Sequence, residues 1–436
     1  MKTKGLIILC AMTLLLSGCS YSNLGVEGLL YAPKLSEEQT VIHQTLIDSV
    51  GTNIQLKYPK TGDNRSAILF ANLDDEPTQE ALVFYQKTNS SGTDNTIRIN
   101  VLDNLNGKWQ SVYDLGGMST DVDKIVISKL GSSNSVNIIV GFNTVNKAEK
   151  VLKIYNYENK QLKEIYSDNY SVMETMDMDQ DNQNELITVT NSTGNTNGQA
   201  KMFKSVDGQI KCVSTVDMEK DTVEYKNIVK GKIDDNSPSI YVDALKTNGA
   251  LKTEVLNFKY NMLNNPLFLN SNATNLNTTR PIGYSSIDID NDGIVEIPLV
   301  KPFLGYQQMP LDQQINQTTW YSVLDYFNLK AKYTSYFNIN DGYVFIIPDK
   351  WKSVVTLKTD TKTDEVIFFK YDGQLSDNMT ELLRIRVCVR KNTQELEYEG
   401  YDKIKSKGQI DYLVRLKNGD PLSLSLLEFV NNFYVL

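Results

Sequence analysis

The chain has 436 residues, of which 41% are hydrophobic and 22% charged, a composition typical of a folded protein with about two or three domains. Its net charge of −9 argues against nucleic acid as a partner, because phosphate binding needs a basic surface. The chain has a single histidine, His43, and this excludes histidine-rich zinc sites. Because His43 falls in a predicted surface helix, serine–histidine and cysteine–histidine catalysis are also disfavoured.

The N-terminus, MKTKGLIILCAMTLLLSGCS, has the pattern of a secretory signal. Its apolar run, 6–16, is too short to span a bilayer, where about 20 residues are needed. The run ends in Leu16-Ser17-Gly18-Cys19, which resembles the lipobox of bacterial lipoproteins. The resemblance implies that 1–18 is a lipoprotein signal peptide and that Cys19 carries a diacylglyceryl group with acyl chains such as palmitate. The alternative is an ordinary signal peptide with a chance cysteine.

A lipid on Cys19 would anchor the mature chain to the extracytoplasmic face of the cell membrane. Residues 19–35 are predicted to form a tether and 36–52 an N-terminal helix. Ser36 and Gln39 have the spacing of a capping box. The apolar stripe of this helix comprises Val41, Ile42, Leu46 and Ile47. We expect the stripe to pack on the next domain.

Residues 53–337 form a series of short β-type runs in which one unit repeats. Each copy places an apolar residue inside a polar turn and follows it with a dense apolar strand. The five inner apolar residues are Leu73, Leu130, Met178, Ile233 and Ile289, spaced 57, 48, 55 and 56 residues apart. A period near 50 with about four strands per unit is typical of a β-propeller blade.

The predicted fold is therefore mainly β: a β-propeller of about five to seven blades, followed by a small α+β C-terminal domain over 338–436. A sixth unit is expected around 298–337. The segment NIQLKYP, from Asn53, is expected to complete the last blade and close the ring. In the C-terminal domain, Leu424, Leu427 and Val430 have helical spacing. Cys212 and Cys388 fall in different predicted domains, and we expect both to be free and buried.

Two of the predicted turns are strongly acidic. One contains Asp177, Asp179, Asp181 and Glu185, and the other Asp288, Asp290, Asp292 and Glu296. In both, carboxylates stand at positions 1, 3, 5 and 9, which, with a backbone carbonyl at position 7, would give Ca²⁺ most of its 6 to 8 oxygen ligands. Neither is an EF-hand, because position 12 lacks the bidentate glutamate. The alternatives are an acidic turn without metal and a catalytic carboxylate pair, which would need a cleft.

The acidic turns resemble the calcium loops of FG-GAP or VCBS-type propeller repeats, including those of integrin α chains. That resemblance implies that structural Ca²⁺ binds within a blade. A degenerate copy supplies weaker metal candidates, with Pro77 at the glycine position; these are Asn72, Asp74, Glu76 and Glu80. The turns around Leu130 and Ile233 have lost most of their acids, and we expect them to bind nothing.

These features predict a lipid-anchored, extracytoplasmic β-propeller with calcium-stabilised loops that acts as a binding or structural module at the cell surface. Its partners would be the membrane, through the anchor, and a protein or glycan ligand. One alternative is a calcium-dependent extracellular hydrolase or lyase on the same scaffold, and another is an envelope assembly factor. The sequence has no P-loop, HExxH or GxSxG motif, and no basic cluster stands beside the acidic turns in the sequence, which argues against an enzyme for anionic substrates.

Overall fold

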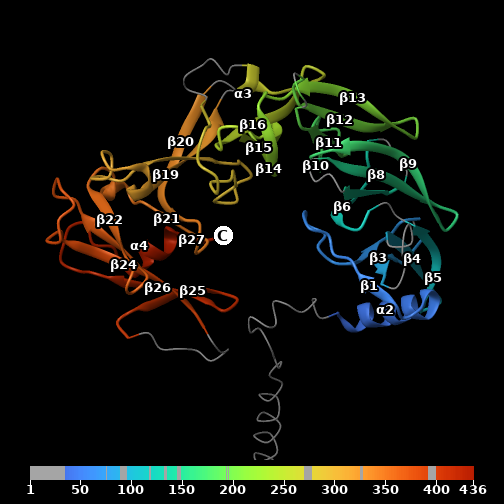
Figure 1. Ribbon diagram of the computed structural model, residues 1–436, viewed down its shortest axis with the longest axis horizontal. Coiled ribbons are helices and arrows are strands. Elements are labelled where there is room, and N and C mark those ends of the chain that lie inside the picture. The colour runs from blue at the N-terminus through green and yellow to red at the C-terminus, as the bar shows by residue number, and fades with distance from the viewer. Residues whose placement is uncertain are drawn as a thin grey trace, which may run out of the picture. The chain divides into compact units, whose positions relative to one another are not determined.

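The computed structural model describes residues 35–74, 76–88, 96–116, 119–131, 135–144, 149–192, 194, 196–269, 277–324, 328–390 and 399–436. The described chain is mainly β, with 55% strand and 8% helix, in several antiparallel sheets (Figure 1). It divides into two compact units, one of 35–303 with 309–347 and one of 304–308 with 348–436. The predicted signal peptide and Cys19 lie outside the described residues, as does the tether up to residue 34. Within the described part, none of the helices has the length and apolarity that a membrane crossing requires.

The predicted N-terminal helix is confirmed as α2 (Glu37–Val50). Its capping box forms as expected: the Gln39 N–H donates to Ser36 Oγ at 3.2 Å, and the Ser36 N–H donates to Gln39 Oε1 at 3.1 Å. Ile42 and Leu46 are fully buried, whereas Val41 is 54% exposed, so the buried stripe is narrower than predicted. The buried face packs against the first sheet of the larger unit and covers it.

Five antiparallel sheets follow one another in the larger unit, and each contains four strands that are consecutive in sequence and form a meander (Figure 1). The first has β2 (Ile68–Ala71), β3 (Glu80–Lys87), β4 (Ile97–Leu105) and β5 (Lys108–Gly116); the second has β6 (Val122–Ser128), β7 (Asn137–Asn143), β8 (Lys150–Glu158) and β9 (Gln161–Tyr170). The third has β10 (Val172–Met176), β11 (Glu185–Thr190), β12 (Gln199–Val206) and β13 (Gln209–Asp217); the fourth has β14 (Thr222–Lys232), β15 (Pro238–Lys246), β16 (Leu251–Lys259) and β17 (Met262–Asn264). The fifth has β18 (Ile297–Pro302), β19 (Asn316–Leu324), β20 (Asn328–Asn338) and β21 (Tyr343–Ile346), and two short helices, α3 (Pro266–Leu269) and η4 (Leu311–Gln313), lie in the connections.

A separate hydrophobic core lies between each pair of successive sheets. The second strand of a sheet contributes to both neighbouring cores, because alternate residues of a strand point to opposite faces. In β7, for example, Ile138 faces the core shared with the first sheet and Ile139 the core shared with the third. In β11, Leu186 and Ile187 divide in the same way. This double burial explains the dense apolar runs of the repeat.

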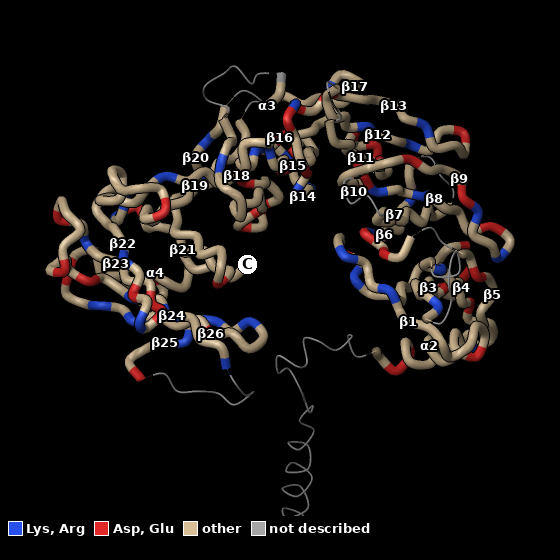
Figure 2. Tube along the Cα trace, viewed as in Figure 1, with Lys and Arg blue, Asp and Glu red and all other residues tan. Residues whose placement is uncertain are grey.

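The inner apolar residue of every repeat is buried, as the repeat pattern predicts. These residues are Leu73, Leu130, Met178, Ile233 and Ile289, all at most 5% exposed. Figure 2 shows basic and acidic residues interleaved along the strands.

Two predictions about the number and closure of the blades are wrong. Residues 298–337 hold no sixth unit, because β18, β19 and β20 belong to the fifth sheet. The segment from Asn53 does not complete the last blade: β1 (Ile54–Leu56) pairs with residues 85–87 of β3 in the first sheet. It does so because β2 covers only residues 80–83 of that edge of β3. Among the described residues, no core joins the first sheet to the fifth, and no closed propeller is detected.

The smaller unit contains an antiparallel sheet in the order β22 (Val355–Asp360), β23 (Glu365–Lys370), β24 (Glu381–Val389), β26 (Ile410–Leu416) and β25 (Asp402–Lys407). It also contains η5 (Asp349–Trp351), α4 (Leu426–Asn431) and β27 (Phe433–Val435). The continuous C-terminal part of this unit begins at Pro348 and not at 338, because β21 pairs with β20.

Two smaller predictions need correction. The C-terminal helix has only six residues and buries Phe429, which stacks on Phe433 at 5.3 Å, whereas Leu427 is 70% exposed. A helix this short presents one anchoring side chain to the core and not a stripe of three. Cys212 and Cys388 are free, as predicted, but neither is buried, and Cys212 is exposed on the outer strand β13.

Candidate metal centre

The first acidic loop connects β10 to β11 and is closed by its own carboxylates. The N–H groups of Asp181 and Asn182 donate to the two oxygens of Asp177, at 3.1 and 2.9 Å. Asn182 has a φ of 66°, which asparagine tolerates at the position where the resembled family has glycine. Glu185 is fully buried, and its Oε2 accepts the N–H of Met178 at 2.8 Å. The position-1 and position-9 carboxylates therefore hold the backbone of the loop.

The second acidic loop precedes β18 and repeats these bonds. The N–H groups of Asp292 and Gly293 donate to the two oxygens of Asp288, at 3.1 and 2.8 Å. Glu296 is fully buried, and its Oε2 accepts the N–H of Ile289 at 3.0 Å. The two loops therefore share one conformation, as their common spacing predicts.

Each loop gathers three carboxylates whose oxygens lie within 4.8 Å of one another, a grouping that can hold a metal ion. The groups are Asp177, Asp179 and Glu185 in the first loop, and Asp288, Asp290 and Glu296 in the second. The position-5 residues, Asp181 and Asp292, are not in these groups. One oxygen of each accepts the backbone N–H two residues further along the chain, at 2.9 and 2.8 Å.

A lysine lies inside the first acidic cluster. Lys204 Nζ is 2.5 Å from Asp179 Oδ2, 2.9 Å from Asp181 Oδ2 and 3.2 Å from Glu185 Oε1. Strand pairing places it there: Leu186 of β11 pairs with Phe203 of β12, so Lys204 stands beside Glu185. The first acidic cluster thus has one basic partner, which comes from another strand and not from a basic cluster beside the turn in the sequence.

The second cluster also holds a lysine, but a different strand supplies it. Lys332 Nζ is 2.9 Å from Asp290, 2.6 Å from Asp292 and 3.0 Å from Glu296. Lys332 lies on β20, where the pairing with β19 shifts register. The Tyr333 hydroxyl also donates to Asp290 Oδ2, at 2.6 Å. Both clusters thus contain an ammonium group close to where a bound cation would sit.

The two clusters differ in how many oxygens are left without a hydrogen bond. In the first, two buried carboxylate oxygens accept none: Asp179 Oδ1 and Glu185 Oε1, the second of which only forms the ion pair with Lys204. In the second, both Asp290 oxygens accept hydrogen bonds, one from Lys332 and one from the Tyr333 hydroxyl, and Glu296 Oε1 accepts one from Lys332. Unsatisfied buried acceptors are costly, so the first cluster fits an added Ca²⁺ better than the second.

Burial raises the pKa of both position-9 glutamates, Glu185 and Glu296, to about 7. The backbone N–H that each accepts and the nearby lysine lower the pKa, and a neighbouring aspartate raises it. Burial also lowers the pKa of Lys204 and Lys332, but their carboxylate partners outweigh it and raise both values. In each cluster the lysine therefore stays charged, whereas the position-9 glutamate has a pKa near neutral pH.

We expect calcium to stabilise the protein more at pH 8 than at pH 5.5. The pKa of Glu185 is higher in the folded chain than in the unfolded chain, so its stabilising contribution is complete below about 4.5 and is lost as the pH rises through about 7. A bound cation would take the place of the proton on Glu185, so the protein would keep its stability as the pH rises. Melting temperatures measured from pH 5 to pH 8 in EDTA and in CaCl₂ should diverge as the pH rises, and parallel curves would contradict this expectation.

The degenerate first turn is arranged differently from the two acidic loops. Asn72 donates to the Glu76 carbonyl at 2.6 Å, and the Glu76 N–H donates to Asp74 Oδ1 at 3.2 Å. Only Glu80 keeps its position-9 role, since its Oε2 accepts the Leu73 N–H at 2.7 Å. Within the described residues, these four do not gather into a three-ligand group as the acidic loops do.

The turns around Leu130 and Ile233, which have lost most of their acids, contact the acidic loops that follow them. The backbone around Leu130 forms a parallel bridge with Asn184 next to the first acidic loop, and Lys232 forms one with Ile294 in the second. The N–H groups of Gly131 and Lys232 donate to carbonyls of these loops, both at 2.9 Å. Each acidic loop is therefore hydrogen-bonded to the preceding turn of the neighbouring sheet.

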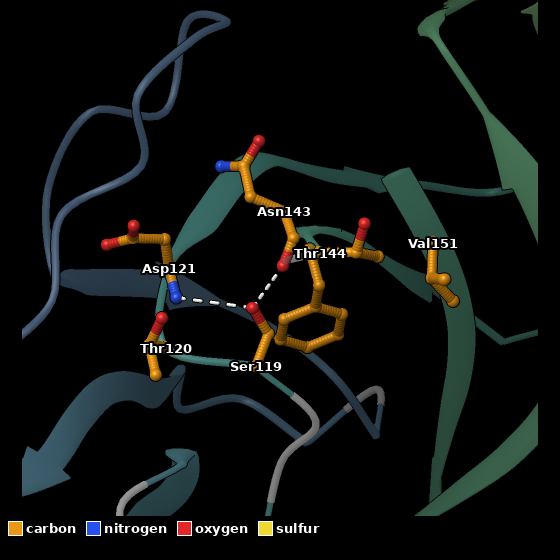
Figure 3. Close-up of a pocket in the computed structure, with 7 residues that line it drawn as sticks. Ser119, Thr120, Asp121, Asn143, Thr144 and Val151 are labelled. Carbon is orange, nitrogen blue, oxygen red and sulfur yellow. Dashed lines mark hydrogen bonds between the residues drawn. The ribbon is translucent and has the colours of Figure 1, made fainter. Parts of the chain in front are cut away.

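A cavity of about 290 Å³ lies at the end of the second sheet (Figure 3). Its lining comprises Ser119, Thr120, Asp121, Phe142, Asn143, Thr144 and Val151. The Ser119 hydroxyl donates to the Asn143 carbonyl and accepts the Asp121 N–H. The Asp121 carboxylate pairs with Lys60 at 2.8 Å. These groups are tied to the protein itself, so the cavity offers no pair of carboxylates for acid–base chemistry.

No family model and no curated protein matches this chain. Among solved structures, the chain is similar to the crystal structure of exotype rhamnogalacturonan lyase YesX, with 11% sequence identity and a TM-score of 0.32. The match covers 73% of this chain and 72% of that chain. At this score the likeness carries no argument about fold or activity.

Proposed function

We propose that this protein is a lipid-anchored scaffold on the extracytoplasmic face of the cell membrane, a binding or structural module and not an enzyme. The observation that supports the proposal most is the use made of the position-9 carboxylates. Glu80, Glu185 and Glu296 are each fully buried, and each holds the backbone N–H of the inner apolar residue of its repeat. Acidic groups engaged in this way stiffen loops, whereas an acid–base pair must face a cleft.

The scaffold is proposed to be a propeller-type array. The support is that five four-stranded meanders follow one another and that each shares a hydrophobic core with the next. Such packing buries both faces of the inner sheets and leaves the loops at the sheet ends for contact with a protein or glycan partner.

Calcium is proposed to bind the first acidic loop, in exchange for Lys204. Asp179, Asp181 and Glu185 would hold it, because they offer oxygens that accept no hydrogen bond or only a lysine. A bound Ca²⁺ would neutralise the clustered carboxylates and tie the loop to β11. In the second loop, calcium would have to displace both Lys332 and the Tyr333 hydroxyl, so we propose that Lys332 is the resident cation there.

We expect Cys19→Ser to shift the protein from the membrane fraction to the soluble extracytoplasmic fraction, because the acyl chains on Cys19 would be the only anchor in this proposal. Cys212→Ser, at the exposed cysteine of β13, is the matched control and should stay in the membrane fraction. Fractionation followed by immunoblotting measures both variants, and protease added to intact cells tests the extracytoplasmic location. Unchanged membrane retention of Cys19→Ser would sink the anchor assignment.

A further inference from the structure

The first sheet has an aspartate, Asp103, at the position where the third sheet has Lys204, the lysine that contacts the first acidic cluster. In the third sheet, the pairing of Leu186 with Phe203 sets Lys204 beside Glu185. In the first sheet, the pairing of Ala81 with Leu102 sets Asp103, on β4, beside Glu80 in the same way. A carboxylate therefore replaces an ammonium at an equivalent position, next to a buried glutamate that is common to both sheets.

Both of these carboxylates are buried, and each has an oxygen without a hydrogen bond. Glu80 is fully buried and Asp103 is 1% exposed. Glu80 Oε2 accepts the Leu73 N–H at 2.7 Å, and Asp103 Oδ2 is 2.9 Å from Lys160 Nζ. Glu80 Oε1 and Asp103 Oδ1 accept nothing. Two adjacent buried carboxylates, each half satisfied, would repel one another and carry a large desolvation cost unless a cation lies between them.

Further acidic groups surround the same point. The buried hydroxyl of Tyr157, on β8 of the second sheet, has no hydrogen-bond partner. Burial is the main cause that raises its pKa, and the carboxylates of Asp103, Glu80, Asp74 and Glu76 add to the rise in that order. Four carboxylates therefore act on one buried hydroxyl. The cation paired with this group is Lys160, whose side chain is 47% exposed and approaches from the turn between β8 and β9.

We propose that Glu80 and Asp103 form a binding site for a hard divalent cation of the calcium type, which ties the first turn to β4. The free oxygens of Glu80 and Asp103 would be the central ligands. All of these donors are oxygens, which favours Ca²⁺ over zinc or copper. The site uses a residue from outside the turn, so it does not depend on the first acidic loop or on the proposed function.

The test uses terbium(III) as a luminescent substitute for calcium, bound to the full-length chain in detergent, with excitation of tyrosine. Asp179→Asn/Asp181→Asn first disables the acidic loop of the third sheet. In this background we expect one sensitised terbium site that calcium displaces. Adding Asp103→Asn should weaken terbium binding by about tenfold or more, because a central charged ligand is lost. Adding Lys160→Met should strengthen binding, because a competing ammonium is removed. Asp207→Asn, at a side chain that is 89% exposed, is the matched control and should leave binding unchanged.

Two outcomes would overturn the proposal. One is a background variant that binds no terbium, and the other is unchanged terbium affinity in both the Asp103→Asn and the Lys160→Met variants. If Glu80 and Asp103 merely share a proton, Asp103→Asn should raise the melting temperature equally in EDTA and in calcium, without any loss of terbium emission. If Asp103→Asn does not fold, the Lys160→Met variant still decides, because its side chain is largely on the surface.

Discussion

Replacing Arg280 by methionine is expected to lower the free energy of unfolding by about 3–5 kcal/mol, because it leaves a buried aspartate without its cation. The side chains of Arg280 and Asp243 are both fully buried, and Arg280 Nη2 lies 2.6 Å from Asp243 Oδ1. Arg280 also donates to the Thr253 hydroxyl at 2.7 Å and to the Thr278 carbonyl at 3.0 Å. Ser286 donates to Asp243 through both its N–H and its hydroxyl, at 2.7 Å each.

This network matters because it positions the start of the second acidic loop. Arg280 forms an isolated bridge with Leu251 of the fourth sheet, and Ser286 is fixed on Asp243 of the same sheet. The next residue, Ile287, then bridges to Glu296, which closes the Asp288 loop. Loss of the buried pair should therefore destabilise the fourth sheet. It should also loosen the contacts between the Asp288 loop and Lys332.

Denaturant unfolding of the full chain measures the effect, with two comparison variants. Lys60→Met breaks the exposed pair with Asp121, whose side chains are 54% and 43% exposed, and should cost less than about 1 kcal/mol. Arg280→Met/Asp243→Leu removes both buried charges and should recover much of the loss, because apolar replacement of a whole buried pair is often close to neutral. An Arg280→Met variant as stable as Lys60→Met would show that the network contributes little.

Much of the repeat could be predicted because its determinants are local. The inner residues Leu73 and Met178 are buried, as their position inside a polar turn predicts. The position-1 and position-9 carboxylates form the same bonds in both acidic loops, because their spacing sets the backbone path. The capping box of α2 is equally local and was correctly predicted.

What could not be predicted depends on strand register. Lys204 and Lys332 reach the acidic clusters from other strands, at points where sheet pairing and a register shift place them. The sequence order contains no sign of that pairing, so the clusters seemed to lack a counter-charge. The position of Asp103 beside Glu80 also depends on strand pairing and cannot be predicted from the sequence. The pairing of Ile54–Leu56 with β3 cannot be predicted, because a strand pattern does not specify which open edge the strand joins.

The second large effect is expected for Lys204→Met. Without calcium, this substitution leaves Asp179, Asp181 and the buried Glu185 without a cation and should destabilise the protein by about 2–3 kcal/mol. The cost is smaller than for Arg280 because the Lys204 side chain is 16% exposed and because Glu185 can take up a proton. With calcium, the same vacated cluster should bind the ion more tightly than the wild type, since no ammonium competes for the oxygens.

Calcium at about 100 times its dissociation constant should then restore about 2.7 kcal/mol to Lys204→Met, and less to the wild type. Unfolding curves in EDTA and in CaCl₂, together with calorimetric titration, measure both quantities. Lys332→Met is the matched variant in the second loop, where the Tyr333 hydroxyl still occupies Asp290, so its calcium response should be weaker than that of Lys204→Met. If Lys204→Met melts at the same temperature in EDTA and in calcium, the first acidic loop does not bind calcium and the lysine is its permanent cation. If Lys332→Met responds as strongly as Lys204→Met, the unbonded oxygens of the first loop are not what selects the metal.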